Sequence, residues 1–274
     1  MESGSDRLTV PLRVAIAGSG NVASHLAEAL AHTSACTLEA VASRNPDHAV
    51  LLAARTNSRA CAYSELAALN PDIIIVSVAD RAMAEVVGQI GRMADTVLAL
   101  HTSGTLDKSC LEPISSRTGI FYPFQTFTKG FDVNMAEVPF FIETAYEDDF
   151  AIAKTLAESI SPHVYVSDEE RRRHLHIAGV FTSNFVNVLL GAVEEELKAS
   201  DYPAEVAVPL LRQTIEKAAA IGSFAAQTGP AVRGDIEVMR RQLAAVDPKY
   251  RETYKVLSHL IMKIHNPTDE QNKL

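Results

Sequence analysis

Hydrophobic residues follow two different spacings along the first part of the chain. Short, continuous apolar runs are typical of strands buried on both faces of a parallel sheet, and the clearest such run is Pro71–Val78. Between the runs, apolar residues recur at helical spacing, as at Val22, Leu26 and Leu30. The predicted strands cover residues 13–17, 37–43, 71–78, 96–100, 119–122, 139–143 and 163–166, and a further helix covers 147–160. This alternation predicts an α/β fold with a doubly wound sheet over residues 12–167.

The spacing changes after Asp168, where strand signals stop and only helical spacing continues. Predicted helices there cover residues 169–199, 204–221, 235–246 and 248–265. The first of them is apolar on nearly every side between Ile177 and Val193, which predicts that it is buried. Residues 168–266 are therefore expected to form a separate, all-α C-terminal domain.

A glycine-rich turn follows the first predicted strand. Gly18, Gly20 and Ala23 occupy the three small positions of a G-x-G-x-x-G/A pattern, which between a strand and a helix is typical of a Rossmann-type dinucleotide site. The first glycine allows the tight turn, and the second lets the backbone approach a pyrophosphate held by the helix N-terminus. A strand-to-helix turn with incidental glycines is the alternative, and the surrounding strand and helix disfavour it.

The end of the second predicted strand indicates which dinucleotide is bound. NAD-binding folds usually place Asp or Glu there to bind the ribose 2′-hydroxyl, whereas this chain has Ser43 and Arg44. Because a guanidinium suits a phosphate, these residues favour NADP(H); the alternative is that Arg44 is an ordinary surface charge. The predicted cofactor contacts are Gly18, Ser19, Gly20, Asn21, Val22, Ser43, Arg44, Ser77, Val78, Ala79, Thr102 and Ser103.

Charge and cysteine usage exclude several classes of partner. The chain carries 25 basic and 34 acidic residues, for a net charge of −9, and has no basic stripe, which disfavours nucleic acid. The scattered cysteines Cys36, Cys61 and Cys110 lack disulfide or metal-ligand spacing. We see no secretory core and no uninterrupted apolar segment of membrane length. We therefore expect a cytoplasmic protein without a metal site, membrane contact or nucleic-acid partner.

Two segments of the first domain carry candidate catalytic groups. His101 closes the strand over residues 96–100, on the side of the sheet where ligands bind. A core histidine bonded to backbone is an equally good interpretation of His101. The aromatic segment over residues 121–127 contains Tyr122 and Gln125 as polar groups that suit a pocket wall, although its aromatics alone favour a core. His101 and Tyr122 are thus candidate proton donors, and Gln125 is a candidate substrate contact.

The long helix and a later loop carry the remaining candidates. His176, Asn184 and Asn187 lie roughly on one face of the helix, where a cleft or a structural hydrogen-bond network would use them equally well. Between two later helices, the loop over residues 226–235 is shaped by glycine and proline. In this loop, Arg233 suits either an acidic substrate or a subunit contact. We assign His176 and Asn184 to catalysis, and Asn187, Gln227, Thr228 and Arg233 to substrate binding.

Taken in order, these segments resemble a known family, the Rossmann-like proteins with a DUF2520 C-terminal domain that are described as NADP oxidoreductases. The segments that carry the resemblance are residues 18–23, 101–104, 121–127, 174–187 and 228–235. The family is similar in architecture to pyrroline-5-carboxylate reductases and to the wider 6-phosphogluconate dehydrogenase-like enzymes, which are dimers whose helical domain completes the active site. The resemblance implies an NADP(H)-dependent oxidoreductase.

One position departs from related branches of that group. The 3-hydroxyacid and ketopantoate branches carry a catalytic lysine four residues before a helix asparagine; Asn184 matches the asparagine, but Val180 occupies the lysine position. We expect hydride transfer between NADP(H) and the C=O or C=N of a small metabolite, with a non-catalytic NADP(H) sensor or scaffold as the alternative. The apolar helix further predicts a homodimer through the helical domains, burying more than about 2,000 Å² in total.

Overall fold

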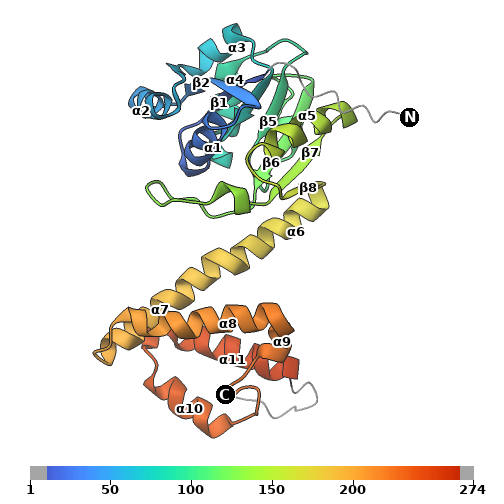
Figure 1. Ribbon diagram of the computed structural model, residues 1–274. Coiled ribbons are helices and arrows are strands. Elements are labelled where there is room, and N and C mark those ends of the chain that lie inside the picture. The colour runs from blue at the N-terminus through green and yellow to red at the C-terminus, as the bar shows by residue number, and fades with distance from the viewer. Residues whose placement is uncertain (1–10, 266–274) are drawn as a thin grey trace. The chain divides into compact units, whose positions relative to one another are not determined.

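The first part of the chain forms one mixed sheet with helices on both faces. The computed structural model describes residues 11–265 (Figure 1). In chain order, the elements are β1 (Leu12–Ala17), α1 (Asn21–Ala31), β2 (Cys36–Ala42), α2 (Pro46–Thr56), β3 (Arg59–Cys61), α3 (Leu66–Leu69), β4 (Ile73–Val76), α4 (Met83–Ile90), β5 (Leu98–His101), β6 (Arg117–Pro123), β7 (Phe140–Thr144), α5 (Glu147–Glu158) and β8 (Val164–Val166). The strand order is β3-β2-β1-β4-β5-β6-β7-β8. The predicted doubly wound α/β fold is therefore confirmed.

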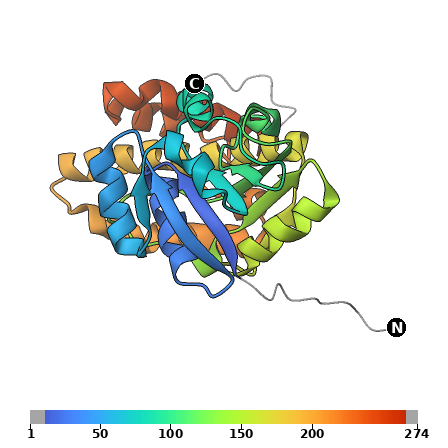
Figure 2. The ribbon, with the colours of Figure 1, turned by 90° about the horizontal axis from the view of Figure 1, so that it is seen from above.

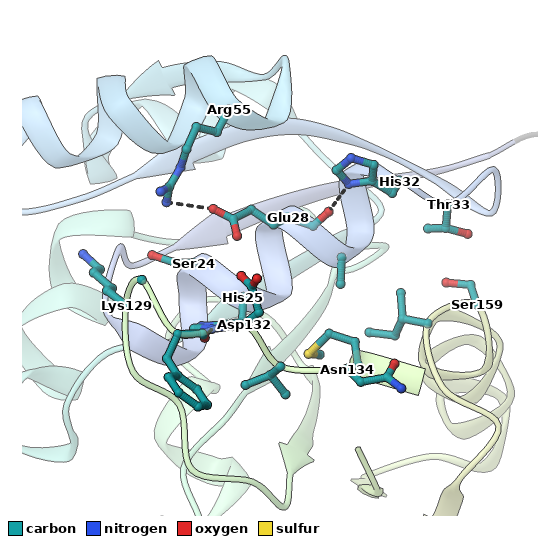
Figure 3. A pocket seen from close by; sticks show the side chains of 16 residues that line it. Ser24, His25, Glu28, His32, Thr33, Arg55, Lys129, Asp132, Asn134 and Ser159 are labelled. Carbon is teal, nitrogen blue, oxygen red and sulfur yellow. Dashed lines mark hydrogen bonds and ion pairs between the residues drawn. The ribbon is translucent and has the colours of Figure 1, made fainter. Parts of the chain in front are cut away.

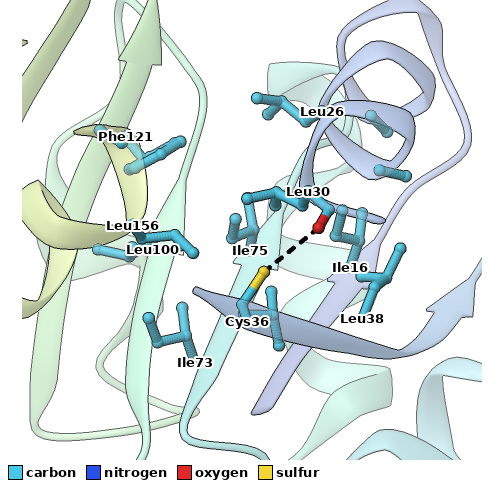
Figure 4. Close-up of a cluster of buried hydrophobic side chains, with 14 of the residues drawn as sticks. Ile16, Leu26, Leu30, Cys36, Leu38, Ile73, Ile75, Leu100, Phe121 and Leu156 are labelled. Carbon is cyan, nitrogen blue, oxygen red and sulfur yellow. Dashed lines mark hydrogen bonds between the residues drawn. The ribbon is translucent and has the colours of Figure 1, made fainter. Parts of the chain in front are cut away.

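Alternation along the central strands builds a separate core on each face of the sheet. In β1, Val14 and Ile16 pack into one core, whereas Ala15 and Ala17 pack into the other. The first core also holds buried residues of α1 and α5, and the second holds those of α3 and α4. Figure 2 shows the ribbon of the sheet with helices on either side of it. Figure 4 shows the first core, in which the Cys36 thiol lies 3.5 Å from the carbonyl oxygen of Leu30. Because both faces are covered, the central strands are apolar throughout.

The observed sheet differs from the predicted one in two respects. β3 spans three residues, which is too short to leave a hydrophobic pattern. β7 pairs antiparallel with β6, with Pro123 opposite Phe140. The other neighbouring strands pair in parallel. The antiparallel pair arises because residues 124–139 form an irregular connection with a single 3₁₀ turn, Met135–Glu137, instead of a crossover helix.

The second part of the chain is helical. Its elements are α6 (Glu169–Gly179), α7 (Val186–Ala199), α8 (Val208–Ile221), α9 (Ser223–Ala226), α10 (Ile236–Ala245) and α11 (Arg251–His265), with a π-helical turn at Val180–Phe185 that joins α6 to α7. Asp235 caps α10 by accepting from the Val238 amide at 3.2 Å. A small core contains Ala231, Met239 and Met262. The all-α character predicted for this part is confirmed.

The chain divides into two compact units, Met1–Ser183 and Asn184–Leu274. This division falls inside the long helix that the sequence assigns whole to a second domain. The domain limits at residues 167/168 stay a prediction, and residue 266 lies outside the described residues.

The predicted burial of the long helix is wrong for the single chain. No residue of α7 is buried, and Val188 is 56% exposed. Within residues 11–265, the segment Glu169–Ala199 is the one helix whose length and composition would allow it to cross a membrane. This differs from the expectation that no apolar segment reaches that length, but a helix that packs against protein passes the same test.

Candidate functional site

A pocket of about 840 Å³ opens at the carboxyl ends of β1, β2, β4 and β5. Every residue that the sequence predicts to contact the cofactor lines it. This is the edge where ligands bind in open α/β sheets. Residues that the sequence analysis missed complete the lining: Asn45, His48, Tyr63, Arg81, Ala82, Glu85, Val86 and Lys129. The binding role of these residues stays a prediction, although their meeting in one pocket follows from the order of the strands.

The two glycines of the turn are required for different reasons. Gly18 has a φ of +139°, and a Cβ there would lie 2.0 Å from the carbonyl oxygen of Ser77, so the turn packs directly on the end of β4. Gly20 precedes α1, and a Cβ there would have no protein atom within 4 Å. The space beside Gly20 therefore opens toward the pocket, next to the unpaired N–H groups of the first turn of α1. These features fit a dinucleotide diphosphate.

Side-chain hydroxyls tie neighbouring strand ends together around the pocket. The hydroxyl oxygens of Ser19 and Ser43 lie 2.7 Å apart, which joins the glycine turn to the end of β2. The Thr102 hydroxyl donates to the Ser77 hydroxyl at 2.9 Å, which joins β5 to β4. Near Ser43, the Arg44 amide donates to the Tyr63 hydroxyl at 3.2 Å. The polar strand ends thus hold one another in place.

His101 is enclosed, not presented to the pocket. Its side chain is 0% exposed, and its Nδ1 accepts from the Ser103 amide at 3.1 Å, so the neutral ring carries its proton on Nε2. Burial, and next the charge of Arg172, lower the pKa of His101 to about 4. This burial fits the core interpretation of His101, and its catalytic role stays a prediction.

A buried arginine, which the sequence analysis missed, underlies this strand end. Arg172 of α6 is 1% exposed and donates through Nη1 to the carbonyl oxygen of Gly104 at 3.1 Å. Its Nε lies 3.5 Å from Glu143, which also pairs with Lys108 at 2.5 Å. One carboxylate thus faces two cations beneath the strand end.

Tyr122 and His176 meet directly over Gly104. The Tyr122 hydroxyl lies 3.4 Å from Nδ1 of His176, and a Cβ at Gly104 would lie 2.6 Å from the same nitrogen. Burial raises the pKa of Tyr122, which keeps its phenol protonated at neutral pH. Both side chains are half-buried, so this pair combines a proton donor with partial access.

The remaining candidates are exposed side chains. Gln125 is exposed and accepts from the adjacent Thr126 amide at 2.8 Å. The others, which are exposed residues of the second unit, are Asn184, Asn187, Gln227, Thr228 and Arg233. The expectation that the helix amides are buried is wrong for the single chain. The catalytic role of Asn184 and the substrate roles of Gln125, Asn187, Gln227, Thr228 and Arg233 stay predictions.

Comparison with known proteins identifies the family. Residues 13–99 match the family described as NADP oxidoreductase coenzyme F420-dependent, and residues 138–261 match the domain of unknown function DUF2520. A crystal structure of a protein described as an NADP oxidoreductase from Bacteroides fragilis shares 34% identity with a TM-score of 0.84, covering 92% of this chain and 98% of that one. The chain belongs to the DUF2520-containing NADP oxidoreductase family. The predicted oxidoreductase class and NADP cofactor are confirmed at this level.

More distant structures share the fold of this NADP oxidoreductase. Pyrroline-5-carboxylate reductase from Streptococcus pyogenes is 12% identical with a TM-score of 0.64, covering 94% of this chain and all of the other. An imine reductase from Myxococcus stipitatus in complex with NADP⁺ is 13% identical with a TM-score of 0.60, covering 93% of each chain. No curated protein matches the sequence. Within residues 11–265, no group of three or more His, Cys, Asp or Glu side chains is arranged to hold a metal ion.

Proposed function

We propose that the protein transfers hydride between NADPH and the C=O or C=N group of a small metabolite. The observation that carries this proposal is the pocket at the carboxyl ends of β1, β2, β4 and β5. There, Gly18 brings the turn against β4, and Gly20 leaves open space at the start of α1. When bound, NADPH supplies the hydride, and the protein's own task is to bind, orient and protonate.

Arg44 and Ser43 are proposed to hold the 2′-phosphate. Support comes from their position at the pocket-lining end of β2, where the ribose 2′ position lies in Rossmann-type sites. Calorimetric titration with NADPH and NADH tests this assignment. We expect Arg44→Gln to weaken NADPH binding by about tenfold and to leave NADH binding unchanged. Equal binding of the two dinucleotides by the unmodified protein would exclude a 2′-phosphate site.

Tyr122 and His176 are proposed to deliver the proton that accompanies reduction. They adjoin Gly104, which directly follows pocket-lining Ser103, and the Tyr122 phenol carries a proton that it can donate. The two cations that share Glu143 beneath them, Arg172 and Lys108, would favour an anionic metabolite. A protonated imine would not need a proton from this pair, whereas a ketone would.

A metabolite screen that follows NADPH absorbance tests the reaction. With any substrate found, we expect Tyr122→Phe to lower kcat by about a hundredfold or more, as the loss of a general acid does. The dissociation constant for NADPH should not change. The matched control is Tyr146→Phe, which changes an exposed tyrosine that does not line the pocket. Turnover unaffected by Tyr122→Phe would remove the proton-donor role.

A non-catalytic NADP(H) sensor or scaffold is the second candidate. It is favoured by the full enclosure of His101 and by Val180 in the place where related branches carry a catalytic lysine. Tight NADPH binding with no turnover across aldehydes, ketones and imines would favour the sensor, whereas a single reduced substrate would exclude it.

We further propose a cytoplasmic homodimer, joined through the helical units, that binds neither nucleic acid nor membrane. The support is the exposed apolar surface of the second unit, including Val188, Leu210 and Ile215, and the free thiols of Cys36, Cys61 and Cys110. In such a dimer, residues of one helical unit would complete the partner's site, and Asn184, Asn187 and Arg233 are the candidates. Purification without detergent as a dimeric species tests the assembly and the absence of a membrane anchor together.

A further inference from the structure

The cations of the first domain are distributed unevenly between ion pairs and the pocket. Seven of the ten arginines and lysines in residues 11–167 form an ion pair with a carboxylate. The three without such a pair among the described residues are Arg44, Arg81 and Lys129, and all three line the dinucleotide pocket. Unpaired cations gathered at one concave site indicate an anionic ligand with more than one charged group.

Lys129 belongs to a different part of the sheet's connections from the other two. Arg44 follows β2, and Arg81 lies in the 3₁₀ turn after β4. Lys129 belongs instead to the irregular loop after β6, whose turn includes Gly130 with a φ of +79°. Lys129 is therefore brought to the pocket by a different segment of the chain from those that carry Arg44 and Arg81.

His25 of α1 holds the loop that carries Lys129. Its Nδ1 lies 2.8 Å from the carbonyl oxygen of Asn21, and its Nε2 lies 3.1 Å from the carbonyl oxygen of Phe131. The His25 ring also packs on Phe127, with centroids 5.0 Å apart. Figure 3 shows this loop beside α1, around a second cavity of about 560 Å³ that Lys129 also lines. The contacts of His25 thus fix the loop against the helix whose first residue, Asn21, lines the pocket.

We propose that Lys129 is a cofactor-binding residue that contacts the dinucleotide diphosphate, and that His25 is the positioning residue that holds its loop against α1. This inference rests on the proposed function, since it assumes that the pocket takes a dinucleotide. The diphosphate is the group expected at the glycine turn and the start of α1, and Lys129 is the unpaired cation whose loop is fastened to that helix. The ammonium adds a mobile point charge to the fixed backbone donors of the turn.

Titration of NADPH and NADH into single variants tests the assignment. Because both dinucleotides carry the diphosphate, Lys129→Gln should weaken both by the same factor, about tenfold. Arg44→Gln should weaken NADPH alone. The matched control is Lys154→Gln, which removes an exposed lysine of α5 outside the pocket and should leave both affinities unchanged. The salt dependence of binding should also become shallower in Lys129→Gln.

A double variant separates positioning from a general loss of structure. His25→Ala should reproduce the loss seen in Lys129→Gln, and combining the two should add little more, because both act through one contact. Thermal unfolding without ligand checks that each variant folds, which is expected for Lys129 because it is exposed.

The possible outcomes distinguish this inference from the proposed function. Unchanged affinities in Lys129→Gln, or a loss confined to NADPH, would overturn the diphosphate assignment while leaving the oxidoreductase intact. Fully additive losses in the double variant would overturn the positioning role of His25. Absence of binding of either dinucleotide to the unmodified protein would overturn the proposed function and this inference with it.

Discussion

At the scale of single residues, Gly18 and Gly20 offer a sharp test of what the turn is for. Gly18→Ala places a methyl group 2.0 Å from a carbonyl oxygen in a left-handed conformation, so we expect a loss of about 3 kcal/mol of unfolding free energy or more. Gly20→Ala meets no protein atom, so its stability should stay within about 0.5 kcal/mol of the unmodified protein. Only dinucleotide affinity should fall in Gly20→Ala. Urea unfolding measures the stability, and titration with NADPH measures the affinity. Unchanged NADPH affinity in Gly20→Ala would contradict the proposal that the dinucleotide diphosphate lies against Gly20.

His101 makes stability depend on pH. Its folded pKa of about 4 lies below the unfolded value of about 6.5, so the unfolded chain binds a proton that the folded chain does not. The contribution of His101 is present above about pH 6.5 and is lost as pH falls through the window down to about 4. We expect about 2 kcal/mol of unfolding free energy to be lost between pH 7 and 5 through this group. His101→Gln should remove that part of the slope in urea unfolding, and an unchanged slope would contradict it.

Some site residues were predictable from the sequence, and others were not, for a physical reason. Gly18, Gly20, Ser43 and Arg44 lie at fixed offsets from a strand, so local spacing identifies them as residues of the pocket. Arg172 reaches Gly104 and Glu143 only after the chain has folded. No local pattern reports such a contact.

At the scale of elements, α6 is fitted closely to the end of β5. A Cβ at Gly104 would lie 2.6 Å from Nδ1 of His176 and 3.1 Å from the Tyr122 hydroxyl, so Gly104→Ala must displace one of them. We expect a loss of about 1–3 kcal/mol, as for overpacking of a core. Gly88→Ala on α4 is the control, since a Cβ there meets nothing within 4 Å, and it should be neutral or stabilising. Equal stability of the two variants would show that α6 can move away from Gly104 without a loss of unfolding free energy.

Element types were predictable where the hydrophobic pattern was long, as in β4 and α8. The short β3 and the direction of β7 were not. The pairing of β7 depends on its neighbour β6 and on a connection without a helix. The direction of a strand therefore depends on the strand it pairs with, and the hydrophobic pattern of one segment alone does not reveal it.

At the scale of the whole molecule, the helical unit leaves more apolar surface uncovered than a soluble monomer usually does. Leu210 is 72% exposed, and Val188, Ile215 and Phe224 are also exposed. We expect light scattering at micromolar concentration to give about twice the chain mass of 29.6 kDa. Leu210→Glu should shift the mass toward the monomer, whereas Gln213→Glu on the same helix should not. A monomeric unmodified protein would exclude the shared site.

The central place of β1 in the sheet has a consequence for hydrogen exchange and ligand linkage. β1 pairs on both sides, with β2 and β4, so its amides should exchange only through global unfolding, while those of the edge strand β3 exchange through local fraying. The dinucleotide turn is covalently continuous with β1. A dinucleotide bound there should therefore slow exchange throughout the central sheet, by the factor 1 + [L]/Kd. If the dinucleotide slowed amide exchange only in the pocket loops, the glycine turn would have to open locally while β1 stays folded.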